Sequence, residues 1–193
     1  MTTSLQIEEH QGVKVLQMVS QDGTNRLTGE VVLALTETIT NLRNDARGLV
    51  ITGNDKSFSA GAELEQIAAL NGPSAYEFAK MGQRLMLTVE DFPAPVYAAI
   101  SGYCMGGGLD LALACHHRIA SAHAVFGHRG AALGLITGWG GTQRLPRLIG
   151  KGRALEMFIA AEKVSADRAL QIGLVNAISE EPLKECVRRI LAP

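Results

Sequence analysis

The sequence of 193 residues is poor in the residue patterns that mark metal sites, disulfide frameworks and membrane anchors. Its three cysteines, Cys104, Cys115 and Cys186, have no C-x-x-C spacing, which favours free thiols in a reducing compartment. With 18 basic and 19 acidic residues, the net charge of −1 provides no basic surface for nucleic acid. No apolar run reaches membrane-spanning length. We therefore expect a cytoplasmic protein that binds no nucleic acid, membrane or metal.

The distribution of apolar residues predicts a single α/β domain over residues 1–193. Apolar residues make up 47% of the chain and charged residues 19%, without repeats or charge blocks. Strands are expected at residues 5–7, 13–19, 48–52, 96–100, 118–120 and 174–178. Helices are expected at residues 28–44, 75–90, 142–148, 152–161, 165–173 and 181–191. A further helix is expected to begin at about residue 63. Strands that alternate with helices favour a parallel sheet.

The glycines at residues 106–108 stand between a buried strand and an apolar helix. They leave backbone N–H groups uncovered at a helix start, where negative charge is favoured. Asp110 follows within the helix, and burying its carboxylate costs free energy unless the group has a partner or a functional role. This combination predicts a site for an oxygen that develops negative charge, although glycines before a helix also serve simple close packing. Small residues at 57–62 form a second such turn.

Three motifs in order make the sequence similar to the crotonase (enoyl-CoA hydratase/isomerase) family. They are FSAGAEL at residues 58–64, PVYAAISGYCMGGG at residues 95–108 and GGTQRLP at residues 140–146. The resemblance implies a spiral of strand-strand-helix repeats, the superfold shared by crotonases and ClpP, assembled as a homotrimer or hexamer. It implies an acyl-CoA thioester substrate and a lyase or isomerase of fatty-acid metabolism. No metal or redox cofactor is expected, since coenzyme A enters as part of the substrate.

The resemblance also assigns site residues. The backbone N–H groups of Ala62 and Gly107 would form the oxyanion hole, and Asp110 would be the first catalytic acid. Residues around Ala60, Ala62 and Leu64 would border the CoA adenine.

Four positions depart from the family's pattern. Asp110 replaces the usual glutamate, and the second acid position is Gly130, which cannot transfer a proton. Gly138 occupies a third acid position, and His116 stands where an aspartate is common. The two-carboxylate hydration mechanism therefore cannot run in its usual form. His128 is a possible substitute for the missing acid, because an extended segment would place it on the same face as position 130.

Several alternatives to a hydratase stay open. Two of them are an acyl-CoA binder without hydratase activity and an enzyme for another enolate chemistry such as decarboxylation. Glycine at position 130 also resembles the dihydroxynaphthoyl-CoA synthase branch, where bicarbonate replaces the carboxylate. A serine hydrolase with the related ClpP spiral would need a Ser-His-Asp set, and neither Ser59 nor Ser101 is marked as a nucleophile. Most of the family's C-terminal helical segment is expected to be absent.

Overall fold

Strands from three sheets build the framework, in a structure that we describe from a computed structural model for residues 3–44 and 46–192. The main sheet has the spatial order β1-β2-β4-β7-β9-β12, the second sheet the order β11-β10-β8-β5, and β3 pairs with β6 alone. The main-sheet strands are β1 (Ser4–His10), β2 (Val13–Val19), β4 (Gly48–Thr52), β7 (Val96–Ile100), β9 (His117–Ala120) and β12 (Ala177–Ile178). The others are β3 (Arg26–Leu27), β5 (Ser57–Ser59), β6 (Gly61–Ala62), β8 (Tyr103–Met105), β10 (Val125–Gly127) and β11 (Val164–Ser165).

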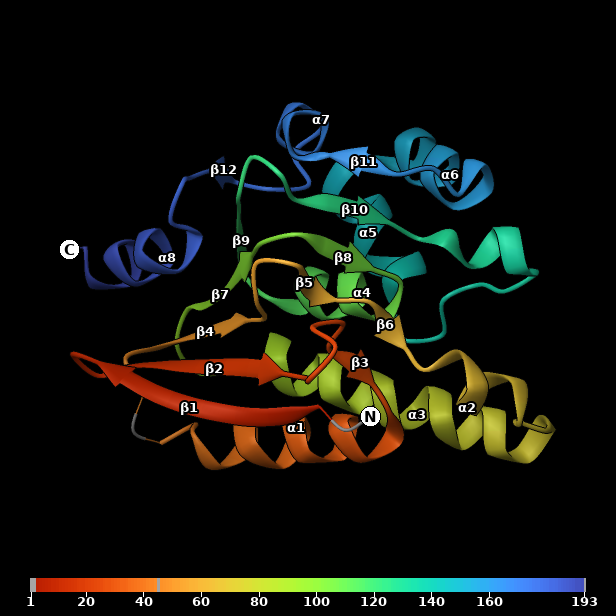
Figure 1. Ribbon diagram of the computed structural model, residues 1–193, viewed down its shortest axis with the longest axis horizontal. Helices are drawn as coiled ribbons and strands as arrows, with labels where there is room; N and C mark the ends of the chain where they lie inside the picture. Colours follow the sequence, from red (N-terminus) through yellow and green to blue (C-terminus); the bar gives the residue numbers. More distant parts are fainter. Residues whose placement is uncertain (1–2, 45, 193) are drawn as a thin grey trace.

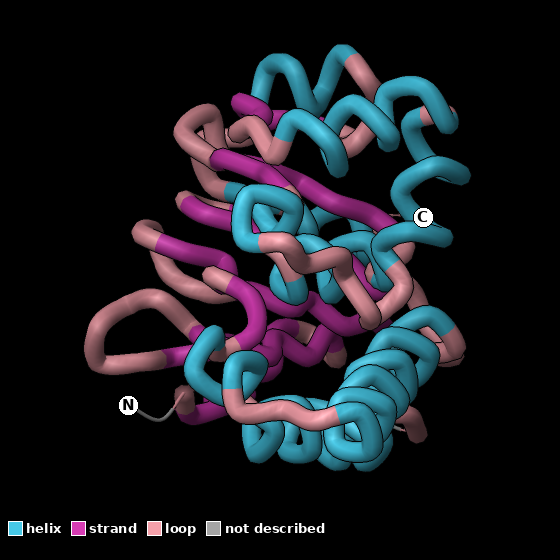
Figure 2. Tube along the Cα trace, turned by 90° about the vertical axis from the view of Figure 1, so that its right-hand side faces the viewer, coloured by secondary structure: helices cyan, strands magenta, loops and turns pink. Residues whose placement is uncertain are grey.

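Helices cover these sheets on several sides (Figures 1 and 2). They are α1 (Gly29–Asn41), α2 (Leu64–Ala68), α3 (Gly72–Glu90), α4 (Gly107–Ala114), α5 (Gly141–Ile149), α6 (Lys151–Ala160), α7 (Ala166–Gln171) and α8 (Pro182–Leu191), together with the 3-10 helix η1 (Arg129–Leu133). Helices α1 and α3 lie below the strands in the first view (Figure 1). Within the described part of the chain, no helix has the length and apolar character that a membrane crossing requires.

The chain winds as a spiral in which each turn contributes one strand to each large sheet. β4 of the main sheet is followed by β5 of the second, β7 by β8, and β9 by β10, with helices after each pair. From β2 to β12 the main-sheet neighbours are parallel. The predicted spiral of strand-strand-helix repeats is therefore confirmed.

Side-chain character explains where the core forms. Every residue of β7 is buried, as in parallel strands covered on both faces. Thr28, the first residue of the helix expected over residues 28–44, is the N-cap of α1 and accepts a hydrogen bond from the Val31 N–H. Further along the same helix, Leu35 and Ile39 are fully buried. All three cysteines are free, as predicted, and all three are buried.

Some predicted boundaries were wrong. The last strand is confined to Ala177–Ile178, because residues 174–176 form bends. Helix α1 ends at Asn41 rather than near residue 44, and α3 begins three residues earlier than expected, behind an Asn71–Ser74 capping box. The short strands β3, β5, β6, β8, β10 and β11 were not predicted, since two or three residues show no measurable period.

His116 has a structural role in place of the aspartate that the resemblance leads one to expect. Its Nδ1 accepts a hydrogen bond from the Val96 N–H at 2.8 Å, and its Nε2 lies 3.0 Å from the Glu90 carbonyl oxygen. The ring thus connects the end of α3 to the start of β7, with the proton on Nε2.

We expect His116→Ala to lower the free energy of unfolding by about 1 kcal/mol, because the Val96 N–H loses its acceptor. Chemical denaturation measures this value. The same substitution at exposed His123 is the control, expected to stay within about 0.5 kcal/mol. Equal losses at both positions would contradict the role assigned to His116.

Candidate active site

Two backbone segments meet where the second sheet ends. A Cβ atom on Gly61, whose φ is +89°, would lie 2.6 Å from the Met105 carbonyl oxygen and 2.9 Å from the Gly107 nitrogen. A Cβ atom on Gly107 would lie 3.4 Å from the Ala62 nitrogen. Because a residue's nitrogen and Cβ are about 2.5 Å apart, the Ala62 and Gly107 nitrogens lie within roughly 6 Å of each other. That separation lets two N–H groups reach one oxygen.

Helix α4 leaves one of these groups free of internal partners. Gly107 is its first residue, and the first N–H groups of a helix have no acceptor inside the helix. Asp110 lies three residues further along and is therefore on the same face. The apolar remainder of α4 is buried, which fixes both in place.

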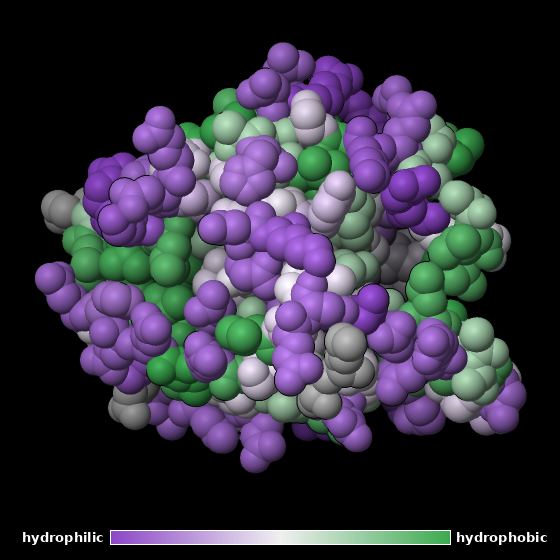
Figure 3. Space-filling view, viewed as in Figure 1, coloured by the Kyte–Doolittle hydropathy of each residue, from purple (hydrophilic) through white to green (hydrophobic). Residues whose placement is uncertain are grey.

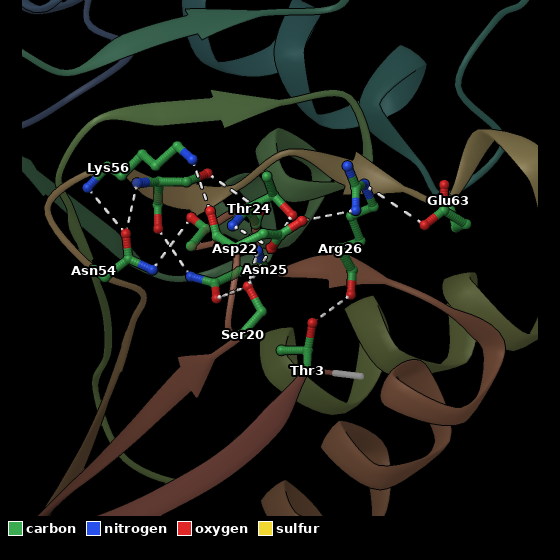
Figure 4. Close-up of polar contacts among 11 residues, drawn as sticks. Thr3, Ser20, Asp22, Thr24, Asn25, Arg26, Asn54, Lys56 and Glu63 are labelled. Carbon is green, nitrogen blue, oxygen red and sulfur yellow. Dashed lines mark hydrogen bonds and ion pairs between the residues drawn. The ribbon is translucent and has the colours of Figure 1, made fainter. Parts of the chain in front are cut away.

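A polar turn before β3 anchors the other segment (Figure 4). Asp22 accepts hydrogen bonds from the Thr24 N–H and hydroxyl at 3.0 and 2.7 Å, which hold the pKa of its carboxyl well below the usual value. The side chain of Asn25, in a left-handed conformation at φ 49°, donates to the Ser57 carbonyl oxygen at 2.9 Å. Since β3 pairs with β6, this turn sets the position of Ala62.

Ser59 belongs to the same anchor. It is fully buried, and its hydroxyl donates to the Asn25 carbonyl oxygen at 2.7 Å and accepts from the Gly61 N–H at 3.1 Å. These bonds give Ser59 a structural role beside β6.

A largely apolar cavity of about 370 Å³ opens beside the two nitrogens. Its walls include all of the site positions predicted from the sequence except His116: Ala60, Ala62, Leu64, Gly107, Asp110, His128, Gly130 and Gly138. Apolar side chains of α2, α3, η1 and α6 complete the lining together with Leu70 between α2 and α3; those of the helices include Ile67, Phe78, Leu133 and Phe158. A cavity with few polar groups strengthens every electrostatic contact inside it.

Asp110 is the buried carboxyl of this cavity, with 1% of its side chain exposed. Burial raises its pKa to about 7, against the opposing effects of the Thr137 hydrogen bond, the Arg144 charge and the Gly141 backbone. The Thr137 hydroxyl donates to Oδ2. Thr137 itself was not predicted, because no pattern in the sequence connects residue 137 to residue 110.

His128 lies against the carboxyl, with its Nε2 3.4 Å from Asp110 Oδ1. The ring is 4% exposed and packs on Phe158, with centroids 5.0 Å apart. Burial lowers the pKa of His128 to about 4. The expected extended segment was wrong, since Gly130 lies in η1 and His128 directly precedes that helix.

Gly130 leaves no room for a side chain. A Cβ atom there would lie 2.8 Å from the Leu135 carbonyl oxygen, and the Leu135 N–H donates to the Gly130 carbonyl oxygen at 2.8 Å. The segment is therefore closed on itself at the position of the missing acid.

Trp139 forms the cavity wall next to Gly107. It is 3% exposed, and its Nε1–H donates to the Phe78 carbonyl oxygen at 3.2 Å. The indole lies flat against α3 where Gly82 has no side chain, because a Cβ atom on Gly82 would be 2.2 Å from the ring. Among the described residues, no group of three or more His, Cys, Asp or Glu side chains is placed to hold a metal ion.

Comparison with known proteins identifies the family. The family model for enoyl-CoA hydratase/isomerase matches residues 8–192. The chain belongs to the enoyl-CoA hydratase/isomerase family. It is 39% identical over 184 residues to a crotonyl-CoA hydratase of Syntrophomonas wolfei subsp. wolfei, covering 93% of this chain and 71% of that protein. It is 41% identical over 155 residues to a probable enoyl-CoA hydratase of Bacillus subtilis, covering 79% of this chain and 60% of that protein.

Solved structures agree with the fold. An enoyl-CoA hydratase from Bacillus anthracis superposes with a TM-score of 0.91 at 33% identity, covering 96% of this chain and 74% of that one. DspI of Pseudomonas aeruginosa gives a TM-score of 0.91 at 35% identity, covering 96% and 72%.

We expect Gly82→Ala to displace the indole from the cavity wall, since the new Cβ has no space beside it. The free energy of unfolding should fall by about 1–3 kcal/mol, more than the helix propensity of alanine returns. Trp139 is the only tryptophan of the chain, so its fluorescence reports the displacement directly. Gly72→Ala, in the same helix with nothing within 4 Å, is the matched control. An unchanged emission spectrum in Gly82→Ala would contradict this packing.

We expect Asp110→Asn to stabilise the protein more at pH 8 than at pH 5. The folded-state pKa of about 7 lies above the ordinary 3.8, so the wild type loses stability as pH rises through this range. The asparagine variant lacks this loss, and its advantage should grow by on the order of 2 kcal/mol between the two pH values. Denaturant unfolding at both pH values measures it, with Asp55→Asn at an exposed position as control. A pH-independent difference would show that Asp110 ionises normally.

Proposed function

We propose that this chain processes acyl-CoA thioesters by stabilising the enolate of the thioester between two backbone N–H groups. The observation that carries the proposal is the convergence of the Ala62 and Gly107 nitrogens, within roughly 6 Å, on one apolar cavity. Each donor aimed at a developing oxyanion is worth about 2.7–4 kcal/mol of transition-state stabilisation. The names of the relatives, which are hydratases of enoyl-CoA substrates, support the same substrate class.

In the proposed complex the thioester oxygen lies between the two N–H groups. Asp110, on the same face of α4 as Gly107, handles the proton at the neighbouring carbon of the acyl chain. Ala60, Ala62 and Leu64 lie along β6 and the start of α2, where they would border the adenine of coenzyme A. The proposal needs no cofactor besides the coenzyme A that the substrate carries.

A homotrimer or hexamer is part of the proposal. Leu133 and Ile136 are 60% and 65% exposed on η1 and the segment that follows it. Hydrophobic surface is visible at this right-hand edge of the molecule (Figure 3). An exposed apolar rim beside the cavity supports contact with another subunit.

Deuterium exchange tests enolate formation without presupposing the later reaction. In D2O, the wild type should exchange the C2 hydrogens of butyryl-CoA, and mass spectrometry follows the gain in mass. Gly107→Pro removes the N–H, while Gly107→Ala adds a Cβ and keeps it. Both variants crowd Trp139, at 2.5 Å from the new Cβ, so their difference isolates the donor.

We expect exchange by Gly107→Pro to be roughly 10²-fold slower than by Gly107→Ala. Binding of butyryl-CoA, measured by calorimetry, should differ far less between the two variants. Equal exchange rates would remove the oxyanion hole from the proposal, and binding without any exchange by the wild type would favour the alternative of a thioester binder.

A further inference from the structure

Asp110 and His128 face each other through the Oδ1 atom of the carboxyl and the Nε2 atom of the ring. Asp110 Oδ1 and His128 Nε2 are buried and without a hydrogen bond among residues 3–44 and 46–192, and they lie 3.4 Å apart. Both residues line the cavity beside Gly107. Burying a polar atom without a hydrogen bond costs free energy. Two such atoms that face each other therefore indicate a function that they share.

Thr137 determines which carboxyl oxygen is free. Its hydroxyl donates to Oδ2 and at the same time accepts the Trp139 N–H at 3.4 Å, which leaves Oδ1 to His128. The backbone of Gly141 also packs closely on the pair, since a Cβ there would lie 2.1 Å from Oδ1 and 3.0 Å from Nε2. Carboxyl and imidazole are thus held as one unit against the cavity.

The separation of the pair decides what fits between them. Two groups that clamp a water molecule by hydrogen bonds of about 2.8 Å need to be roughly 4.5 Å apart, because the angle at the water oxygen is near tetrahedral. At 3.4 Å no water fits between Oδ1 and Nε2. A small approach instead brings them to direct hydrogen-bond distance, with one proton between them.

We propose that Asp110 and His128 act as a single-proton pair that carries a proton between two carbons of a bound acyl chain, so that this site shifts a double bond rather than adding water. The inference rests on the proposed oxyanion hole. It assigns the substrate class as 3-enoyl-CoA thioesters and the product as the conjugated 2-enoyl thioester.

The proton balance needs no further reactant. The pair begins as the Asp110 carboxylate and neutral His128, and it takes the proton from C2 as the C2–H electrons form the enolate. The enolate oxygen lies between the N–H groups of Ala62 and Gly107. The shared proton then passes to C4, where the C3=C4 electrons form the new C4–H bond. The C1=C2 electrons of the enolate become the C2=C3 double bond, and an electron pair of the enolate oxygen re-forms the thioester carbonyl.

The surroundings favour this cycle near neutral pH. Burial is the largest influence on both groups, and it opposes charge on each. The positive charge of Arg144 and the Thr137 hydroxyl favour the carboxylate, while burial keeps the neighbouring Cys104 thiol uncharged by raising its pKa. Arg129 lies on the same cavity wall. The rate should therefore increase with pH as Asp110 loses its proton.

The test compares two reactions of the same protein. The conversion of trans-3-hexenoyl-CoA raises the absorbance of the conjugated thioester, and the hydration of crotonyl-CoA lowers it. We expect the wild type to isomerise faster than it hydrates. His128→Phe, which keeps a ring against Phe158, should lower kcat for isomerisation by about 10²-fold or more with KM little changed. His123→Gln, at an exposed histidine, is the control and should match the wild type.

Thr137 is a positioning residue, and its test is the pH profile. Removal of its hydroxyl in Thr137→Val takes away a hydrogen bond that lowers the pKa of Asp110. The rise of kcat/KM with pH should then move upward by on the order of one pH unit, and Thr137→Ser should restore it. A merely structural role would reduce activity without moving this midpoint.

Faster hydration than isomerisation, or full isomerase activity in His128→Phe, would overturn the inference and leave the proposed function intact. The same holds if butyryl-CoA exchanges its C2 hydrogens but 3-hexenoyl-CoA is not converted. Absence of both exchange and thioester binding would instead overturn the proposed function and this inference together.

Discussion

The close approach of β6 to the first turn of α4 is the contact on which the rest of the site depends. The main chains meet with no side chain between them, since any Cβ on Gly61 would strike the Met105 carbonyl oxygen. The spiral makes this contact possible, because β5 and β8 are parallel neighbours in the second sheet. Their chains leave the sheet side by side, one into β6 and the other into α4. Backbone donors placed in this way need no reorganisation when charge develops.

The cavity adds a second constraint, which concerns charge. Asp110 and His128 are both removed from water, and burial favours the uncharged form of each. A carboxyl next to a charged partner in solvent would be a permanent anion, and an imidazole there would titrate near neutrality. The two groups lie 3.4 Å apart, so the pair mechanism proposed above requires that a proton taken up by one can be shared with the other. Burial favours such sharing, because it opposes a separated positive and negative charge.

The sequence contained enough to predict most of this architecture. Uniformly apolar strands such as β7 and the glycines at the start of α4 have local signals. The family resemblance assigned Ala62, Gly107 and Asp110, which the structure brings to one cavity. The features that were not predicted lie in the segment after β10, where the chain folds back onto α4. The contact of Thr137 with Asp110 joins residues 27 positions apart in a segment without periodicity. His128 was predicted to face the cavity, but from an extended conformation that η1 replaces.

The closed turn at Gly130 explains why an acid could not simply be added at that position. The Leu135 N–H donates to the Gly130 carbonyl oxygen, and the Leu135 carbonyl oxygen occupies the space of a Cβ. A carboxylate there would have to open the turn and move His128, which directly precedes η1. The turn therefore leaves no space for a carboxylate at position 130, and His128 beside it lies 3.4 Å from Asp110. In the proposed mechanism this contacting Asp–His pair takes the place of two separated carboxylates.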